Sequence, residues 1–337
     1  MNKSFDESGV QFAWDSTSLK LAETCFRKYL YKMILGWQPE RKSVHLLFGG
    51  WYASALESYY KYVAEGMSSD EALVEIVSEA LVETWEFDDC STCAGKGMES
   101  WAEPFDQTTA AVCPDCNGEG KLTEGGVPWV SDHNTKTREN LIRTIVWYID
   151  QFGDDDSCST VILSSGAPAV EHSFRLEWDN DIIYCGHLDR LVEYGNAIYI
   201  QDQKTTGSTI TGRYFDGYNP DSQMSGYTFA GKALFGLPIK GIMIDAVQIA
   251  VGFSRFERGF TFRTEDQLNE WYDNSMYHIE KARQATRDNY FPMNPSACGL
   301  FGGCEFRHIC SKAPSIREQF LKGDFVKGPT WDPLLPR

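Results

Sequence analysis

The chain has 337 residues, of which 42% are hydrophobic and 14% aromatic, enough for one large domain or two modest ones. No run of about 18 apolar residues occurs, and the first residues lack the basic-then-apolar order of a signal peptide, so we expect a cytoplasmic protein without a membrane partner. The net charge of −17 argues against a protein that coats nucleic acid by bulk attraction, although a local basic groove remains compatible with it.

The spacing of apolar residues predicts four helices in the first half of the chain. They cover residues 16–35, 45–63, 69–85 and 135–152, with Ser16 as the N-cap of the first. Between about 86 and 130 this periodicity is lost, and Gly, Cys, Asp and Thr predominate. We therefore interpret this stretch as an insertion between two helices.

Ten cysteines in a chain without a secretory signal favour bound metals or redox chemistry over disulfides. CSTCAGKG (90–97) and CPDCNGEG (113–120) in the insertion are two copies of CxxCxGxG. Such turns present two thiolates each, which together suffice for a closed tetrahedral Zn²⁺ site. The four predicted zinc ligands are Cys90, Cys93, Cys113 and Cys116. Chance cysteines in a loop, the alternative, do not explain the repeated glycines.

The two cysteine knuckles resemble the paired zinc-binding repeats of DnaJ-type chaperones over these few residues. The likeness implies a metal, and it implies no chaperone activity. The role of the module stays open between DNA contact, partner contact and bracing of the fold. Its only lysines are Lys96 and Lys121, which argues against a main DNA-binding surface here.

Alternation of apolar residues marks strands in the middle of the chain. It predicts strands at 182–193 and 197–204, joined by a turn at Gly195-Asn196. Asp202 and Lys204 then share one face of their strand, and Asp189 on the partner strand lies within cross-strand reach. A helix at 222–235, strands at 240–253 and 259–263 and a helix at 265–287 follow. This mixture predicts an α/β domain.

Two carboxylates and an ammonium on one surface suit the hydrolysis of a phosphodiester. Carboxylates bind hard cations such as Mg²⁺ or Mn²⁺, which neutralise developing charge and lower the pKa of an attacking water. Lys204 would orient the water or stabilise the pentavalent phosphate. For an isolated Asp-x-Lys pair, however, a surface ion pair is the commoner explanation.

The sequence around the hairpin resembles the catalytic core of the PD-(D/E)XK nuclease superfamily, in its RecB-like branch. GHLDR (186–190) and QDQKTTG (201–207) carry the resemblance. Further along, Gln223 and Tyr227 match a QxxxY helix, and before the hairpin Glu171 takes the place of a frequent acidic residue. The segment 48–60 matches the first helical motif of the branch, GxxxHxxxE, through Gly49 and Glu57.

The resemblance implies a role for each matching residue. Asp189, Asp202 and the Gln203 carbonyl would hold Mg²⁺ or Mn²⁺, and Lys204 would act on the water. Glu171 would support the site, and Gln223 and Tyr227 would touch DNA or order the metal shell.

One position departs from the branch. The histidine of the first motif, a frequent metal ligand, is replaced by Ala53. Its loss should weaken metal binding, although Glu57, one helical turn further on, could compensate in part. A catalytically weak or inactive DNA-binding or scaffolding protein with the nuclease fold therefore stays as the alternative. A third idea makes the zinc module the functional core.

A second set of cysteines combines an early residue with a late triad. The set consists of Cys25, Cys298, Cys304 and Cys310. Four thiolates suit a [4Fe–4S] cluster as well as zinc, and spacing alone does not separate the two. The RecB-like branch often closes an iron–sulfur staple with one early and three late cysteines, which favours the cluster. It would connect the N-terminal helix with the C-terminal segment.

These observations lead to one expectation. The fold is an α/β PD-(D/E)XK core, a mixed sheet flanked by helices, with a zinc-knuckle insertion and an iron–sulfur staple. Residues 1–86 form its N-terminal helical part, 87–125 the zinc module and 126–337 the core. The expected activity is a DNA exonuclease acting on single strands or duplex ends, of phage-type recombination, repair or CRISPR-adaptation context, in the host cytoplasm if phage-encoded. Recombination or adaptation proteins are possible partners.

Overall fold

The computed structural model describes residues 4–93, 98–99, 111–117, 119–122, 125–155, 157–328 and 331–335. The chain forms two compact units. The first consists of Met1–Ser43, Asp155–Gln248 and Arg255–Arg337, and the second of Val44–Asp154 and Ile249–Ser254. This division follows contacts in space, whereas the division into 1–86, 87–125 and 126–337 stays a prediction from sequence.

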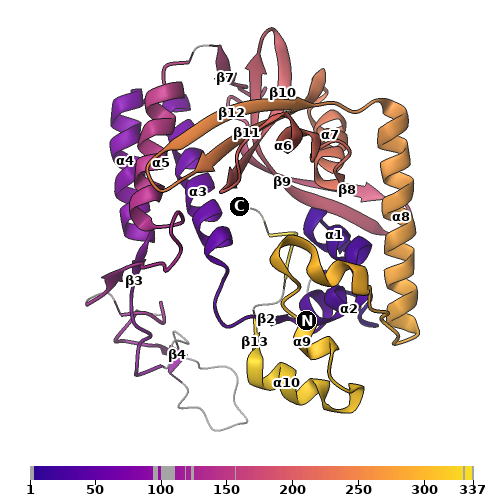
Figure 1. Ribbon diagram of the computed structural model, residues 1–337. Coiled ribbons are helices and arrows are strands. Elements are labelled where there is room, and N and C mark those ends of the chain that lie inside the picture. Colours follow the sequence, from indigo (N-terminus) through magenta and orange to yellow (C-terminus); the bar gives the residue numbers. More distant parts are fainter. Residues whose placement is uncertain are drawn as a thin grey trace. The chain divides into compact units, whose positions relative to one another are not determined.

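A mixed seven-stranded sheet forms the centre of the first unit (Figure 1). The strand order is β1-β9-β10-β11-β12, and β7 and β8 also pair with β9. β9 runs antiparallel to β8 and β10, whereas β10 runs parallel to β11. The strands are β1 (Ala13–Trp14), β7 (Cys158–Thr160), β8 (Val170–Trp178), β9 (Ile182–Tyr194), β10 (Ala197–Thr206), β11 (Ile239–Ile249) and β12 (Ser254–Thr261). The predicted α/β class, a mixed sheet flanked by helices, is confirmed.

The β9–β10 hairpin is the predicted one. Its turn residues Gly195 and Asn196 have φ values of 57° and 60°, in the left-handed region that these two residue types adopt most readily. The pairing runs from Ala197 opposite Tyr194 to Gln201 opposite Arg190.

The two hairpin strands part immediately after this last pair. β10 continues alongside β11, from Asp202 opposite Ile244 onward. The N-terminal half of β9 pairs with β8 and β1 instead. We call the point of parting, Asp189–Arg190 on β9 and Gln201–Asp202 on β10, the strand fork.

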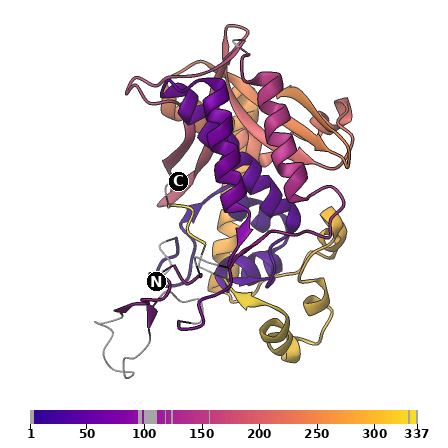
Figure 2. The same ribbon diagram turned by 90° about the vertical axis from the view of Figure 1, so that its left-hand side faces the viewer.

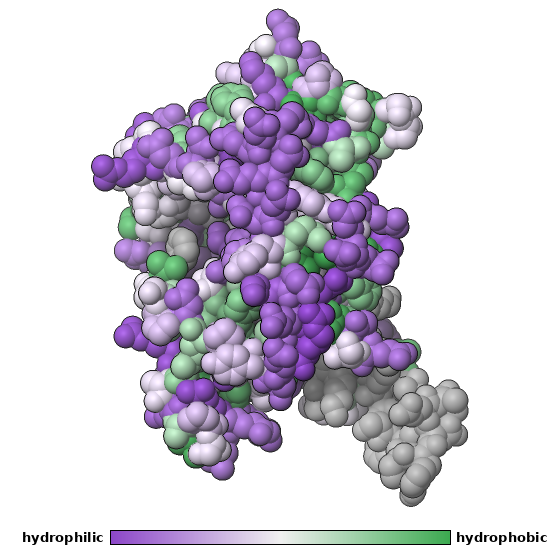
Figure 3. Space-filling model, turned by 90° about the vertical axis from the view of Figure 1, so that its right-hand side faces the viewer, coloured by the Kyte–Doolittle hydropathy of each residue, from purple (hydrophilic) through white to green (hydrophobic). Residues whose placement is uncertain are grey.

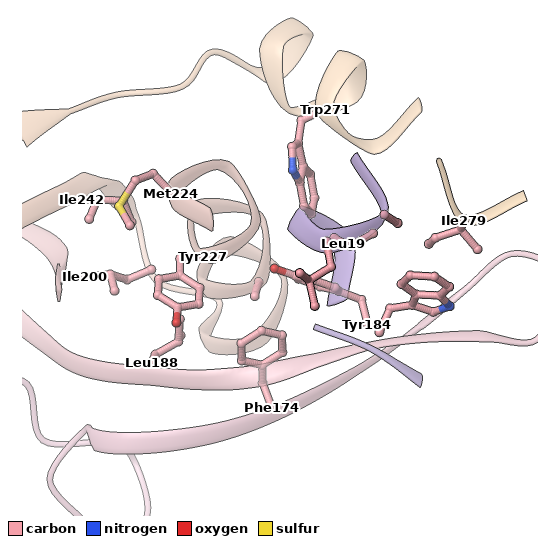
Figure 4. Packing of buried hydrophobic residues seen from close by; sticks show 14 of the residues in the cluster. Leu19, Phe174, Tyr184, Leu188, Ile200, Met224, Tyr227, Ile242, Trp271 and Ile279 are labelled. Atoms are coloured by element: carbon pink, nitrogen blue, oxygen red, sulfur yellow. The ribbon is translucent and has the colours of Figure 1, made fainter. Parts of the chain in front are cut away.

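Three helices form a hydrophobic core with the sheet around the fork. They are α1 (Ser16–Thr24), α7 (Ser222–Phe235) and α8 (Glu265–Arg287), and they pack against one another. Tyr184 of β9 lies among their aromatic side chains, 5.4 Å from Trp271 between ring centroids (Figure 4). Gly226 of α7 makes this approach feasible, because a Cβ there would lie 2.0 Å from the Tyr184 hydroxyl oxygen.

Helix α8 has the bounds that its apolar spacing predicts. The Thr264 hydroxyl caps it by accepting a hydrogen bond from the Gln267 backbone N–H. The Gln267 side-chain oxygen in turn accepts one from the Thr264 backbone N–H. Its buried residues recur every three or four positions, while hydrophilic residues predominate on the side of the molecule where α8 lies (Figure 3). The helix therefore buries its apolar face and exposes its polar face.

The single helix predicted over 16–35 is wrong, and so is its cap. Asp15 is the N-cap of α1, with Ser18 completing a capping box. Cys25 then adopts an extended backbone that ends α1 and starts α2 (Phe26–Tyr29), which continues as a π-helical turn (Leu30–Ile34). The break frees the Cys25 sulfur to accept from the Asn294 N–H, at 3.4 Å.

The C-terminal segment of the first unit contains several short regular elements. It contains a 3-10 turn (Pro295–Gly302), α9 (Arg307–Cys310), a second 3-10 turn (Pro314–Ile316), α10 (Arg317–Asp324) and β13 (Val326–Lys327). β13 pairs with β2 (Trp37–Gln38), so both ends of the first unit are joined by a short ladder.

The second unit is built on three helices that lie side by side (Figure 2). They are α3 (Val44–Ala64), α4 (Ser69–Glu83) and α5 (Arg138–Phe152). The hydroxyl groups of Tyr60 and Tyr148 share a buried hydrogen bond of 2.8 Å between α3 and α5. No helix within the described ranges has the length and apolar character needed to cross a membrane.

The cysteine insertion leaves this helical unit through a two-stranded stem. β3 (Trp85–Glu86) pairs with β6 (Val127–Pro128), which brings the two ends of the insertion together. Gly126 is required in the stem, because a Cβ there would lie 2.5 Å from the Phe87 ring and 2.6 Å from the Trp85 ring. Inside the insertion, β4 (Met98–Glu99) pairs with β5 (Ala111–Val112).

Because the stem closes on itself, we predict that the insertion can be removed without unfolding the helices. Replacing residues 87–125 by a short Asn-Gly turn should preserve the helical circular dichroism and leave the melting temperature within a few degrees of the parent value. A loss of cooperative unfolding would show that the helical unit depends on the module.

Candidate active site

The strand fork brings two carboxylates and an ammonium together. Asp202 is 1% exposed, and its Oδ2 lies 2.6 Å from Nζ of Lys204. Asp189 accepts the backbone N–H of Gln203 at 3.1 Å. Ile200, two residues before Asp202, belongs to the core beneath α7, so alternation directs Asp202 and Lys204 to this same face.

The two acidic groups of the fork resist being charged at the same time. Burial, together with the neighbouring Asp189 charge, raises the pKa of Asp202 to about 6, although Lys204 opposes the shift. Burial also acts to lower the pKa of Lys204, but the charges of Asp202 and Asp189 outweigh it and raise that pKa. The site therefore contains more negative charge than Lys204 alone neutralises well.

This imbalance fits a divalent cation. Buried Asp202 has the Lys204 ammonium beside it, 2.6 Å from Oδ2, while the charge of Asp189 acts on the same carboxylate. Carboxylate oxygens converging from two strands are ligands that Mg²⁺ and Mn²⁺ prefer. Asp189 and Asp202 would hold such an ion.

Helix α7 contributes a polar pair to the same region. Nε2 of Gln223 donates to the hydroxyl of Tyr227, one helical turn on, at 3.0 Å. Burial raises the pKa of Tyr227 well above its ordinary value, and the charges of Asp189 and Asp202 raise it further. Its hydroxyl therefore lies within electrostatic reach of both carboxylates, while its ring packs in the core beside Leu188 and Ile200 (Figure 4).

Glu171 lies at the start of β8, beside the fork. The flanking pairs Val170–Arg190 and His172–Leu188 place it opposite Asp189. Its φ of 46° is left-handed, which costs a non-glycine residue about 1 kcal/mol or more.

The first helical motif lies in the second unit, on α3. Glu57 is half-buried and forms an ion pair with Lys61, one turn further on. Ala53 stands one turn before Glu57, on the same side of the helix. The proposed cooperation of Glu57 with the fork stays a prediction.

The match with known proteins agrees with this arrangement. The model of the family described as "PD-(D/E)XK nuclease superfamily" matches residues 14–311, most of the chain. The chain belongs to this superfamily. A crystal structure of a protein from Eubacterium rectale described as a "putative exonuclease" is similar over 91% of this chain and 92% of that one, at 12% identity and a TM-score of 0.46. The structure of SSO0001 covers 42% of this chain and 64% of that one, at 10% identity and a TM-score of 0.22. No curated protein matches.

Two tyrosines of the nuclease fold escaped the sequence motifs. Tyr214 lies on α6 (Gly212–Asp216), directly after the lysine strand, and accepts from the Tyr218 hydroxyl at 3.0 Å. Burial raises the pKa of Tyr214, and both Lys204 and Asp202 act on its charge. Tyr214 therefore borders the fork. A five-residue helix has too little periodicity to be recognised from sequence.

Arg263 holds the segment that follows α6. It is 7% exposed, and its guanidinium donates to the carbonyl oxygen of Tyr218 at 2.8 Å and to the Asn219 side chain at 3.3 Å. On its other side it donates to Ser225 of α7 at 2.8 Å. This arginine therefore fixes the tyrosine segment to the start of the QxxxY helix and does not belong to a basic surface groove.

A buried polar network lies behind the fork, on the opposite face of the sheet. Arg190 donates to the Gln201 side chain at 3.0 Å, to the Thr160 hydroxyl at 2.8 Å and to the Cys158 carbonyl at 3.1 Å. Gln201 in turn donates to Asp245 of β11 at 2.5 Å. The network joins β7, β9, β10 and β11 at the last shared pair of β9 and β10.

The four cysteines of the insertion form a closed group. All four are buried, and their sulfur atoms lie within 4.8 Å of one another. The Cys90–Cys113 and Cys93–Cys116 sulfur distances are 3.8 and 3.7 Å. Four sulfurs placed tetrahedrally about 2.3 Å from one ion are about 3.8 Å apart, so the spacing fits a single Zn²⁺. Of the predicted glycines, Gly120 donates its N–H to Cys116 at 3.2 Å, while Gly95, Gly97 and Gly118 lie outside the described residues, as does Lys96.

The outer cysteines meet where α2 approaches the C-terminal segment. Cys304 donates its N–H to the Cys298 carbonyl at 3.0 Å, and Asn294 bonds to the Cys25 sulfur. Burial raises the pKa of Cys310, and Cys25 and Cys304 are among the groups whose charge acts on it. Within the described residues these sulfurs do not form a group as close as the inner one.

The raised pKa of Asp202 predicts a pH dependence of stability without divalent ions. Between its ordinary value of 3.8 and about 6, the folded protein keeps a proton that the unfolded chain releases. The free energy of unfolding should therefore fall as the pH rises through this window, by about 3 kcal/mol from this group. Urea titrations of Asp202→Asn should show a flatter profile and greater stability at neutral pH.

Asp273→Asn, at an exposed position on α8, is the matched control and should follow the parent profile. Parallel profiles for the parent and Asp202→Asn would show that Asp202 is ionised at the same pH in both states.

Proposed function

We propose that the protein is a metal-dependent deoxyribonuclease that cleaves DNA from single-stranded or duplex ends. The observation that carries the proposal is the convergence of Asp189, Asp202 and Lys204 at the strand fork in a chain of the PD-(D/E)XK superfamily. The net charge of −17 agrees with a substrate that is engaged locally at the fork rather than over a broad surface.

The residues of the fork divide the work of hydrolysis. A divalent ion bound there supplies positive charge and a water of lowered pKa. Asp189 and Asp202 hold the position for the ion, with the Gln203 carbonyl as a further ligand. Lys204 orients the attacking water in line with the phosphorus and stabilises charge on the phosphoryl oxygens. Glu171 supports this arrangement from β8.

The neighbouring helices position the substrate. The Gln223–Tyr227 pair orders the water and ligand shell around the ion, or touches the strand itself. The Tyr214 hydroxyl already accepts a hydrogen bond from the Tyr218 hydroxyl, so its own O–H is directed elsewhere and suits an oxygen of the bound phosphate. Glu57 compensates in part for the histidine of the first motif, whose position is occupied by Ala53.

The biological setting is proposed from the RecB-like resemblance. Phage-type recombination, repair or CRISPR adaptation would each use an end-directed nuclease of this size in the cytoplasm, with recombination or adaptation proteins as partners. The second candidate function is a DNA-binding or scaffolding protein that keeps the fold with weak or no catalysis, and Ala53 is the observation that favours it.

We further propose Zn²⁺ in the inner cysteine group and a [4Fe–4S] cluster in the outer one. The single-ion spacing of the inner sulfurs supports the first assignment. The resemblance of Cys25 and the late triad to the iron–sulfur staple of the RecB-like branch supports the second. Both groups are structural in this proposal.

Lys204→Ala provides the test of catalysis. We expect it to lower the rate of Mn²⁺-dependent degradation of end-labelled DNA at least about 100-fold, since it removes the group that orients the water. Lys232→Ala, which removes a half-buried lysine paired with Glu265, should leave the rate unchanged. Equal rates for Lys204→Ala and the parent would reject the mechanism. An inactive parent that still binds DNA but no Mn²⁺ would favour the scaffold.

The cysteine assignments predict two separable metal contents. Protein purified without oxygen should contain about one zinc and four iron atoms per chain, with a broad visible absorption. Cys93→Ser should lose zinc and keep the visible band, whereas Cys304→Ser should lose the band and keep zinc. Zinc in both groups, measured by elemental analysis, would contradict the cluster.

A further inference from the structure

Three basic side chains of the second unit form a cluster that the proposed chemistry does not use. His45 lies in the first turn of α3, and His133 and Lys136 precede α5. The two imidazole rings meet edge to face, with centroids 4.9 Å apart. The Lys136 ammonium lies 4.4 Å from the centre of the Phe48 ring, one turn along α3 from His45. We call these three residues the basic cluster.

The hydrogen bonds of His133 determine which of its nitrogens is available. Nδ1 accepts the backbone N–H groups of Thr135 and Lys136, at 3.2 and 3.1 Å. In the neutral ring the proton is therefore on Nε2. Nε2 then offers a hydrogen-bond donor and no lone pair for a metal. The chemistry of this ring favours an anion over a cation.

Lys136 carries a positive charge that packs on the Phe48 ring and has no anionic partner among the described residues. The residue is 1% exposed, and its ammonium has no hydrogen-bond acceptor among the described residues. Burial lowers the pKa of Lys136 to about 8, so the group remains mostly protonated at neutral pH. An isolated buried ammonium is costly, and its retention calls for a negative partner.

The cluster repels additional positive charge but has an open side. Burial and the charges of His133 and Lys136 all lower the pKa of His45. His45 is exposed and His133 half-buried, whereas Lys136 lies behind them. The N-terminus of the 15-residue helix α5 begins two residues after Lys136 and adds the positive end of its dipole.

We propose that the basic cluster is a binding site for a phosphate group. Nε2 of His133 and the His45 ring contact the phosphate oxygens, and Lys136 acts from behind through the low-dielectric interior. That the phosphate belongs to a nucleic-acid strand rests on the proposed function. That the site binds a phosphate group rests on the chemistry of its three residues alone. A strand phosphate held here would add a local anchor to a chain whose net charge of −17 otherwise repels DNA.

Histidine NMR tests the proposal without requiring cleavage. The chain has six histidines, so protein labelled with ¹³C at histidine Cε1 has few resonances, which His45→Gln and His133→Gln would assign. Titrations without divalent ions would use inorganic phosphate, a 5′-phosphorylated single-stranded oligonucleotide and the same oligonucleotide without the terminal phosphate. We expect saturable shifts of the His45 and His133 resonances, with the other four unmoved.

Two lysine variants separate a binding role from a structural one. Lys136→Met keeps the length of the side chain and should weaken phosphate binding about tenfold or more, while raising the melting temperature by a few degrees because an uncompensated buried charge is lost. Lys281→Met, at an exposed position on α8, should change neither. Unchanged affinity in Lys136→Met, or histidine resonances that no ligand moves, would overturn the proposal.

The three ligands distinguish the source of the phosphate. Tighter binding of the 5′-phosphorylated strand assigns the site to a DNA end, and equal binding of both strands assigns it to a backbone phosphodiester. A response to inorganic phosphate alone supports the site and rejects the strand as its ligand. Because no cleavage is measured, a phosphate-binding protein that lacks nuclease activity would refute the proposed function and leave this inference standing.

Discussion

The parting of β9 and β10 after the Arg190–Gln201 pair is the constraint on which the site depends. In an uninterrupted ladder Asp189 and Asp202 would be opposed side chains on a closed sheet. Because β10 goes on with β11 while β9 turns to β8, the Gln203 N–H is bound by the Asp189 carboxylate. The buried bonds of Arg190 and Gln201 set the place of parting, since moving it would leave their polar atoms unpaired.

The fork is locally unfavourable and is stabilised from elsewhere. Asp202 is buried beside a second carboxylate, and Glu171 adopts a left-handed backbone. Strain and perturbed acidity of this kind gather at functional sites, where the surrounding fold imposes them. Here the surroundings are the aromatic core around Tyr184 and Trp271, and Arg263, which secures the segment bearing Tyr218.

Features of the fold with a local cause could be predicted from sequence. Helix α8 and the β9–β10 hairpin follow from apolar period and from a turn whose residues accept positive φ, and the inner cysteine group follows from CxxC spacing. The break at Cys25 accompanies a hydrogen bond to Asn294, far away in the chain, which the spacing of apolar residues around Cys25 does not predict.

The burial of a basic residue likewise cannot be predicted from its residue type alone. Arg263 and Lys136 are buried, although their type predicts solvent exposure. Whether a basic side chain is buried depends on partners brought by the fold: carbonyl groups of the Tyr218 segment for Arg263, and the Phe48 ring for Lys136. The hairpin carboxylates could be identified because several motifs follow one another in a fixed order along the chain. That order restricts which strands can pair, whereas the residue type at a single position does not.

The two cysteine groups differ in how much of the structure they join. The inner group is closed by local turns, such as the bond from the Cys90 N–H to the Gly120 carbonyl, and the β3–β6 stem isolates it. The outer group joins α2 to a segment at the other end of the chain, a closure with a large entropic cost. Direct contacts offset part of that cost, through the 2.9 Å ion pair of Lys28 with Glu305 and the packing of Tyr31 on Phe306. Loss of a metal from the inner group should therefore be felt locally, whereas loss of the proposed outer cluster would act on the unit that contains the fork.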